Sequence, residues 1–455
     1  MKIAIVGAGL AGSLLSVYMA RRGYEVHIFE KRSDSRKEGY VGGRSINLAL
    51  SHRGIRALED LGIAKEILPL AIPMKGRMLH DLQGNQSFFP YGKDESEYIN
   101  SISRGGLNEA LISIAESYPN VKYYFNTPCT DIDFDKNILQ FEDSTFVADL
   151  IFATDGAGSI VRQKMAQTGL CQDHTEFLEH GYKELEISAG KNGEFLLDKY
   201  SLHIWARDSF LLIALPNLDG SFTVTLFLQN KGDESFESLN TPKKARAFFE
   251  KYFADALALM PDFEEDFFLN PVGLLGTLKA YPWAYKNTLL LGDAAHAIVP
   301  FYGQGMNASF EDCFLLNQLI DTHSKDWETI FQKFQQERKK DADAIADLAV
   351  ENFYEMRDKV NDTEFQRMRK LEYILENTYP DYHSKYSMVT FHPEIPYSVA
   401  RDRGNKQNSY LLKLCSENED ISELDSKSVY EEIQKLHQEQ QAIPESIKLW
   451  FDEPK

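Results

Sequence analysis

The spacing of apolar residues along this chain changes character several times, and each change predicts a different kind of structure. Residues 2–6 form a short apolar run, residues 10–22 place apolar side chains at helical intervals, and residues 25–30 have the pattern of a second strand. This succession predicts a βαβ unit at the N-terminus. A further helix is predicted at residues 51–61, where Gly62 suits the C-terminal stop.

Between residues 182 and 230 the pattern becomes that of an antiparallel sheet. Four segments have the alternation or the composition of strands: 184–187, 200–205, 210–215 and 221–228. The turn sequence Asn217-Leu218-Asp219-Gly220 joins the last two as a hairpin. This sheet predicts a second domain, and an apolar strand at residues 288–291 returns the chain to the first domain.

The remainder of the chain has mostly helical spacing. Residues 242–262 return to a helical pattern, and residues 307–320 and 327–379 predict long helices. A charged amphipathic helix is predicted at residues 427–441. Because the chain contains no apolar run of the length that a transmembrane helix needs, we expect no membrane span.

Charge and cysteine content argue against two classes of binding partner, nucleic acid and metal ions. The 455 residues carry a formal net charge of -20, and so acidic a chain repels phosphate backbones, which argues against nucleic acid as a partner. The four cysteines form no CxxC pair, which indicates free thiols in a reducing compartment and argues against a metal site. Since no signal-peptide pattern is seen before the first strand, we expect a cytoplasmic protein. The sequence leaves monomer and homodimer both open.

The loop after the first strand carries the first candidate chemistry. Gly7 permits a tight turn, Gly9 lets the backbone approach a pyrophosphate, and Gly12 lets helix and strand pack closely. The helix that follows directs free N–H groups and its positive dipole end at the phosphates. The predicted cofactor contacts of this loop are Gly7, Gly9, Leu10, Ala11 and Gly12.

An acidic residue completes this motif at the end of the second strand. Glu30 can accept hydrogen bonds from ribose hydroxyls and disfavours a 2′-phosphate, so the site suits FAD or NAD rather than NADP. The neighbouring Lys31 is predicted to contact the cofactor as well.

Two later motifs point to the same ligand. Asp155 ends an apolar strand ahead of a Gly-Ala-Gly-Ser turn, and Asp293 follows Gly292 at another strand end, where a carboxylate can bind the ribityl hydroxyls of FAD. His296 follows soon after, and a histidine beside alanines at a helix start is more often a packed or capping residue than a general base. The glycine-bearing loop that comes next adds the predicted contacts Gly303, Gly305, Met306 and Asn307.

Together these motifs indicate that one non-covalently bound FAD spans the chain. We therefore predict an α/β fold in which an inserted antiparallel β-sheet domain binds the substrate. The predicted boundaries are residues 1–75, 100–180 and 270–345 for a Rossmann-like FAD-binding domain, 76–99 and 181–269 for the sheet domain, and 346–455 for a C-terminal helical region.

The order of the glycine loop, the Asp-Gly motif and the Gly-Asp motif resembles that of the single-component FAD-dependent aromatic hydroxylases over most of residues 1–345. Within that group the chain is most similar to the kynurenine 3-monooxygenase family. The segments that carry this closer resemblance are 43–54, 74–80, 90–93, 99–104, 203–205, 213–217, 299–301 and 388–391.

This resemblance implies a reaction. Members of the family hydroxylate L-kynurenine beside its ring amine, with NADPH as co-substrate and O2, through a flavin C4a-hydroperoxide. Because the ring amine activates the substrate, no residue is assigned as a catalytic acid or base. The protein has to orient the ring and keep water away from the flavin.

The resemblance also implies site residues. Arg77 and Tyr91 match the positions that bind the substrate's α-carboxylate, and a guanidinium with a hydroxyl is well suited to that role. The remaining substrate contacts implied in this way are Asn352, Tyr386, Ile213, Leu215, Phe227 and Phe301. Arg44 and Arg104 match positions near FAD.

Two other functions stay open at this point. One is a related FAD hydroxylase that acts on a different aromatic or polyketide substrate, against which the Arg77 and Tyr91 pair argues, because an uncharged ligand has no use for a carboxylate clamp. The other is a non-catalytic flavin-fold protein that binds a partner or a lipid, against which the intact Asp293 argues. Tyr302 departs from some members of the family, which have histidine there.

Overall fold

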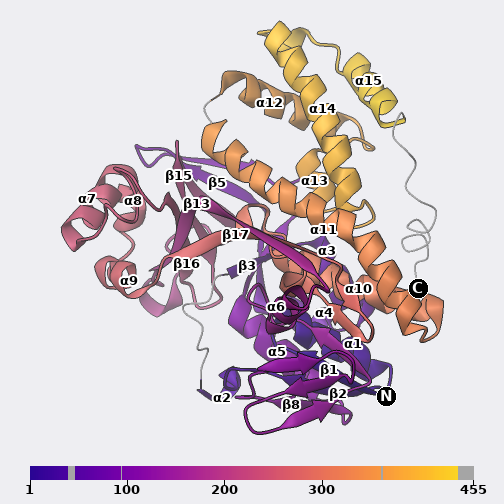
Figure 1. Cartoon of the computed structure of the whole chain (residues 1–455). Coiled ribbons are helices and arrows are strands. Elements are labelled where there is room, and N and C mark those ends of the chain that lie inside the picture. The colour runs from indigo at the N-terminus through magenta and orange to yellow at the C-terminus, as the bar shows by residue number, and fades with distance from the viewer. Residues whose placement is uncertain (39–46, 94, 360–361, 439–455) are drawn as a thin grey trace.

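The N-terminal βαβ unit is part of a mostly parallel sheet at one end of the molecule (Figure 1). The structure is a computed structural model that describes residues 1–38, 47–93, 95–359 and 362–438. The strand order is β18-β19-β12-β1-β2-β8, and every neighbouring pair is parallel except β18 with β19. The bounds are β1 Lys2–Val6, β2 Glu25–Phe29, β8 Val121–Tyr124, β12 Leu150–Ala153, β18 Ala284–Tyr285 and β19 Thr288–Leu290.

Helices α1 (Leu10–Arg21), α5 (Arg104–Glu116) and α10 (Gly305–His323) pack next to one another in this domain. The predicted first helix is confirmed, and nine consecutive residues of α1, from Gly12 to Ala20, are buried. Helix α3 (His52–Asp60) packs on α10, and the predicted stop is confirmed as well, since Gly62 has φ +67°.

A second, mainly antiparallel sheet lies beside the first domain (Figure 1). Its strand order is β17-β13-β16-β15-β14-β5-β6, in which only β14 and β5 are parallel. The predicted hairpin is confirmed, with the Asn217 N–H donating to the Ser221 carbonyl at 2.8 Å. The bounds are β5 Gly76–His80, β6 Gln86–Pro90, β13 Gln172–Ile187, β14 Ser201–Arg207, β15 Phe210–Pro216, β16 Phe222–Gln229 and β17 Gly273–Tyr281.

This sheet includes residues on both sides of the boundaries that the sequence predicted at 181 and 269. Strand β13 begins at Gln172, and β17 begins at Gly273 and pairs with β13 in antiparallel fashion. Strand β13 continues across the predicted boundary at 181, whereas its partner β17 lies wholly beyond the one at 269, and local residue patterns reveal neither pairing. Two small sheets that the sequence did not predict complete the fold: β3 (Asn47–Leu50) with β4 (Ala71–Met74) and β7 (Ile99–Ser103), and β9 (Asp131–Asp133) with β10 (Ile138–Gln140) and β11 (Thr145–Val147).

Alternation along the second sheet sends its side chains into two separate cores. Leu212 and Ala214 of β15 pack with the helices α7 (Pro242–Tyr252), α8 (Ala254–Leu257) and α9 (Phe263–Leu269), which cover one face. Leu211 of the same strand and its cross-strand partner Phe227 pack on the other face, against residues of the C-terminal helices. One face therefore builds the core of the sheet domain, and the other is left to form a site with the rest of the chain.

Long helices cover that second face. The predicted helix at 327–379 is two helices, α11 (Trp327–Asp358) and α12 (Thr363–Thr378), and the side chain of Asp362 caps the second. Helix α11 runs from the first domain to the far end of the molecule, where α12, α14 (Tyr397–Glu417) and α15 (Ser426–Gln438) gather, with α13 (Lys385–Thr390) below them (Figure 1). None of the helices in the described ranges is long and apolar enough to cross a membrane.

Candidate functional site

The three glycines of the first loop have different surroundings. A Cβ added to Gly7 would lie 2.7 Å from Asp155 Cα, and one added to Gly12 would lie 2.0 Å from the Gly7 carbonyl oxygen. Gly7 also has φ +99°, so neither position tolerates a side chain. A Cβ on Gly9, in contrast, would meet no atom of the described residues within 4 Å. Gly9 therefore leaves room for a ligand against the start of α1.

Helix α1 offers that ligand uncommitted N–H groups. Its first intrahelical bond runs from the Ser13 N–H to the Gly9 carbonyl at 2.8 Å. The N–H groups of Leu10, Ala11 and Gly12 precede that bond, and no side chain of the described chain caps the helix at Gly9. These groups and the positive end of the helix dipole suit a phosphate.

Glu30 lies beside this loop. Its carboxylate accepts the Ala8 N–H at 2.8 Å and the Arg32 N–H at 2.9 Å, and it still has lone pairs for a ribose hydroxyl. Lys31 is exposed and does not line the pocket that the described residues form here. That pocket is lined by Ala8, Gly9, Leu10, Glu30, Arg32, Ser33, Ser35, Arg104, Asn108, Ile112 and Phe125.

Asp155 is packed under the glycine loop. One of its carboxylate oxygens accepts the Ile160 N–H at 2.8 Å, while the other is buried without a hydrogen-bond partner among the described residues. Burial raises the pKa of this carboxyl. A buried acceptor that lacks a partner is a mark of a binding site for a donor group.

Asp293 lies in a short turn at the end of the same parallel sheet. Burial raises its pKa, and the nearby positive charge of Arg104 opposes that effect. Arg104 is the first residue of α5 and also lines the glycine-loop pocket. Arg104 therefore acts on Asp293 and also lines the pocket, although the sequence separates the two residues widely. Arg44, which was predicted to lie near FAD, falls outside the described residues.

The loop at 303–307 brings a second helix N-terminus to this region. Gly303 has φ +65°, and α10 then begins at Gly305 without a side-chain cap from any described residue. The side chain of Asn307 is bonded to the backbone, since its amide nitrogen donates to the Ala49 carbonyl at 2.8 Å and its oxygen accepts the Ser51 N–H at 2.9 Å. Asn307 can therefore offer a ligand only its backbone N–H group, and Met306 offers its own backbone N–H group in the same turn.

These observations fit FAD. The described residues supply two uncapped helix N-termini for negatively charged or electron-poor groups, an open glycine position, and acids at 30, 155 and 293 for hydroxyls and other donors. Among the described residues, no cluster of histidine, cysteine and acidic side chains is arranged to hold a metal ion.

A second group of residues meets where β5 and the residue after β6 approach α13. The Arg77 guanidinium lies 4.9 Å from the centre of the Tyr91 ring and 4.4 Å from that of Tyr386, and these two rings are stacked 5.7 Å apart. Tyr302 stacks on Tyr386 at 5.7 Å. The hydroxyl of Tyr91 is buried without a well-formed hydrogen bond in the described chain. Burial lowers the pKa of Arg77, but the nearby Tyr386 and Tyr91 raise it above its ordinary value.

Apolar side chains from the sheet continue this group. Ile213 packs with both the cluster around Tyr91 and the cluster around Phe227, and Leu215 packs with the first. Phe227 contacts Phe301 with ring centres 4.9 Å apart. The amide of Asn352 donates to the Phe301 carbonyl at 2.7 Å and so ties α11 to this wall. All eight residues that the family resemblance named for the substrate are thus gathered in one region.

Three neighbours of this region were not predicted. Arg369 of α12 lowers the pKa of Tyr302 against the larger raising effect of burial, which places its charge near that ring. Phe353 lies 4.6 Å from Phe301 between ring centres, and Tyr302, which departs from some members of the family, stacks on Tyr386. No local sequence motif surrounds Arg369 or Phe353. Their nearness to the site becomes visible only when α11 and α12 pack against it.

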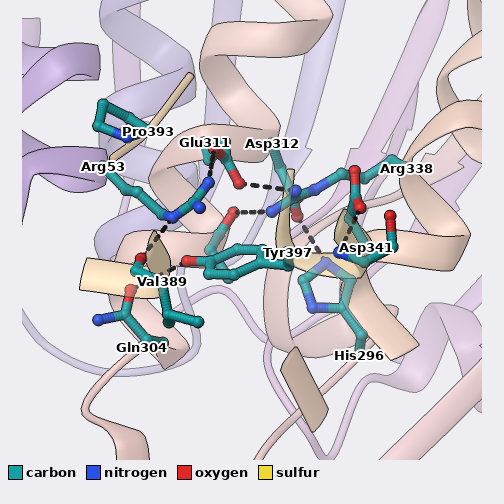
Figure 2. A network of polar contacts seen from close by, with 12 residues as sticks. Arg53, His296, Gln304, Glu311, Asp312, Arg338, Asp341, Val389, Pro393 and Tyr397 are labelled. Carbon is teal, nitrogen blue, oxygen red and sulfur yellow. Dashed lines mark hydrogen bonds and ion pairs between the residues drawn. The ribbon is translucent and has the colours of Figure 1, made fainter. Parts of the chain in front are cut away.

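His296 is not free to act as a general base. It is buried, and its Nε2 lies 2.7 Å from the Asp312 carboxylate inside a group of polar contacts (Figure 2). This agrees with the prediction that it is a packed residue.

The chain shares its sequence with proteins of known name. The family described as FAD binding domain matches residues 1–349. Kynurenine 3-monooxygenase of Myxococcus xanthus (strain DK1622) is 49% identical over 420 residues, which is 90% of this chain and 90% of that protein. The proteins of the same name from Dictyostelium discoideum and Legionella pneumophila (strain Corby) are 44% and 40% identical, over 92% and 95% of this chain and 94% and 97% of their own length.

Solved structures show the same fold at low sequence identity. The tetrameric form of 2-methyl-3-hydroxypyridine-5-carboxylic acid oxygenase has a TM-score of 0.61 and 19% identity, covering 79% of this chain and 93% of that one. PqsL of P. aeruginosa, in complex with 2-aminobenzoylacetate, has a TM-score of 0.65 and 17% identity, covering 79% of this chain and 97% of that one. The relatives at 40–49% identity over about nine-tenths of the chain are decisive, and the chain belongs to the kynurenine 3-monooxygenase family of FAD-binding proteins.

Proposed function

We propose that this protein hydroxylates L-kynurenine beside its ring amine. One O2 and one NADPH are consumed with a proton, one oxygen atom enters the ring in place of hydrogen, and the other leaves as water. The names of the relatives and the fit of the cofactor region to FAD support the reaction class. The contact of the Arg77 guanidinium with the rings of Tyr91 and Tyr386 is the observation that favours kynurenine as the substrate.

That cluster suits the α-carboxylate of an amino acid. Arg77 presents its positive charge among aromatic rings, and the buried Tyr91 hydroxyl is ready to donate. In a site with little water, hydrogen bonds from charged donors are about twice as strong as neutral ones. A substrate carboxylate would give both groups the partner that the described protein does not supply.

The apolar wall suits the rest of the substrate. Ile213, Leu215, Phe227 and Phe301 offer an aromatic ring a surface without charge. When bound, FAD reduced by NADPH activates O2 and delivers one oxygen atom to the ring. The protein's part is to fix the ring's position through the carboxylate at one end and the wall at the other, and to keep water out.

The experiment that tests this proposal compares two substrates. NADPH oxidation by the FAD-loaded protein is measured with L-kynurenine and with its decarboxylated analogue kynuramine, and the products are analysed by mass. We expect kynurenine to stimulate oxidation and to gain one oxygen, and kynuramine to need a far higher concentration. Equal use of both compounds would refute the carboxylate clamp, and no oxygenated product from either would refute the proposed reaction.

An Arg77→Ala variant sharpens the comparison. Loss of the guanidinium should raise KM for kynurenine strongly, with FAD still bound, because the clamp is separate from the cofactor residues. The same variant should change KM for kynuramine little, since that substrate has no carboxylate to lose. If Arg77→Ala weakens both substrates equally, the arginine acts on the fold of the site and not on the carboxylate.

A further inference from the structure

Behind the cofactor-facing segments lies a cluster of buried charges (Figure 2). Arg53 of α3, Glu311 and Asp312 of α10, and Arg338 of α11 are each no more than 3% exposed. Opposite charges pair here, with Arg56 also 3.0 Å from Glu311 at the edge of the cluster. None of the four belongs to the residues that the motifs assign to FAD or substrate. Replacing such a pair by apolar residues is often neutral or stabilising, so stability alone does not explain the cluster.

Asp312 holds the turn that presents Asp293. One of its carboxylate oxygens accepts the Gly292 N–H at 3.0 Å and also lies 2.7 Å from His296 Nε2. This single side chain therefore fixes residues on both sides of Asp293. Burial would raise the pKa of Asp312, but the charges of His296 and Arg338 outweigh burial and keep the pKa below its ordinary value.

Arg338 links that carboxylate to the start of α10. Its Nε donates to the other oxygen of Asp312 at 2.6 Å, and a terminal nitrogen donates to the Ala308 carbonyl at 3.0 Å. The other terminal nitrogen donates to Glu311 at 2.7 Å. The Ala308 carbonyl belongs to the first turn of α10, whose free N–H groups face the cofactor region. One planar guanidinium thus connects the two cofactor-facing backbone segments.

We infer that Asp312 and Arg338 act as one positioning pair for FAD, setting the distance between the Asp293 turn and the N-terminus of α10. The inference rests on the FAD contacts proposed above and adds to them a support that lies behind the site. Neither side chain touches the cofactor in this assignment. Both act through backbone groups, Asp312 through Gly292 and Arg338 through Ala308.

The test measures FAD affinity in variants that keep the shape of the cluster. Arg338→Lys keeps the charge but cannot donate in three fixed directions. Asp312→Asn keeps the size but loses the charge and replaces one of the two acceptor oxygens by a donor. Apoprotein is titrated with FAD at a temperature well below each variant's unfolding midpoint, and the flavin fluorescence gives Kd. We expect each variant to bind FAD about tenfold more weakly, or about 1.4 kcal/mol. KM for kynurenine at saturating FAD should stay unchanged.

The double variant tests whether the two residues act as a unit. If they do, Arg338→Lys with Asp312→Asn should weaken FAD no more than the stronger single change. Additive losses would overturn the pairing. Asp312→Asn is isosteric, and it supplies the Kd comparison by itself if Arg338→Lys does not fold.

A matched control separates positioning from general stability. Arg207 in the sheet domain is also buried and donates to backbone carbonyls, among them those of His80 at 2.9 Å and Tyr252 at 2.9 Å. Arg207→Lys should therefore lower the unfolding midpoint while leaving FAD affinity unchanged. Equal effects of Arg207→Lys and Arg338→Lys on Kd would overturn the inference.

A second control keeps this inference distinct from the cofactor site itself. Glu30→Gln should weaken FAD directly, because Glu30 lies in the glycine-loop pocket. If Glu30→Gln weakens FAD and Arg338→Lys does not, the positioning pair is wrong and the cofactor site stands. If neither change affects Kd, the proposed cofactor site fails and the inference with it.

Discussion

Replacing Tyr91 by phenylalanine should stabilise the free protein and weaken its substrate. The hydroxyl of Tyr91 is buried with no well-formed hydrogen bond among the described residues. Arg77 and Tyr386 are near enough to act on its pKa, but neither meets it with the geometry of a full hydrogen bond. A buried polar group without a partner costs about 1–3 kcal/mol of folding free energy. Removal of this hydroxyl therefore raises stability in the free protein and removes a donor when a carboxylate binds.

The size of the binding effect follows from the charge of the ligand. A hydrogen bond to a charged group contributes about 1.5–3 kcal/mol. Tyr91→Phe should therefore raise the Kd for kynurenine by about 10- to 150-fold. Arg77 stays in place in this variant, so the effect is expected to be smaller than that of Arg77→Ala.

The chain offers a matched control in Tyr382, whose hydroxyl is also buried without a partner in the described chain but lies in the C-terminal helical core. Tyr382→Phe should raise stability in the same way and leave kynurenine binding unchanged. The unfolding free energy of both variants is measured by urea titration, and kynurenine affinity is measured by its effect on the flavin absorbance.

Two results would refute this reasoning. If Tyr91→Phe lowers the unfolding free energy, the hydroxyl has a partner in the free protein. If it raises the unfolding free energy but leaves kynurenine affinity unchanged, the hydroxyl does not donate to the substrate, and the clamp reduces to Arg77 alone.

Three further predictions test other parts of the structure. Gly12→Ala should prevent folding of the N-terminal domain, because the new Cβ would lie 2.0 Å from the Gly7 carbonyl oxygen, whereas Gly9→Ala should fold normally and weaken FAD; circular dichroism and FAD titration distinguish them. Burial lowers the pKa of His203 from 6.5 to about 4, so the unfolded chain binds a proton that the folded chain does not, and stability should fall by about 3 kcal/mol as the pH drops through that range. His203→Gln should remove that part of the pH dependence in urea titrations, and an unchanged profile would contradict the assignment. Burial raises the pKa of the Cys313 thiol well above its ordinary value, so this cysteine should react with a thiol reagent only after unfolding, as peptide mass mapping would show.

Features that depend on neighbouring residues were predictable from the sequence. The glycine spacing predicted a tight turn and a close helix contact, because both are set within a few residues, and Gly7 and Gly12 show these constraints. The hairpin after β15 followed from its turn residues, and alternation along β15 placed Ile213 and Leu215 on one face. Family resemblance supplied Arg77 and Tyr91, and without it Arg77 would have been assigned to an ordinary surface ion pair.

The tertiary structure decided which distant segments meet. Strand β13 crosses the predicted boundary at 181 to pair with β17, which lies beyond the boundary at 269, and pairing between strands far apart in sequence leaves no local signal. Asp312 and Arg338 follow no motif, and each is an ordinary charged residue of a helix until α10 and α11 pack together and bury both.

The sequence by itself therefore determined the cofactor class, the βαβ opening and the family, because these depend on short patterns of turn, period and motif. Only the tertiary structure decided that the Tyr91 hydroxyl lacks a partner, that His296 is held by Asp312, and that one guanidinium joins the two segments facing FAD. The physical reason is that burial and hydrogen-bond partners are properties of the packed chain, in which residues hundreds of positions apart become neighbours.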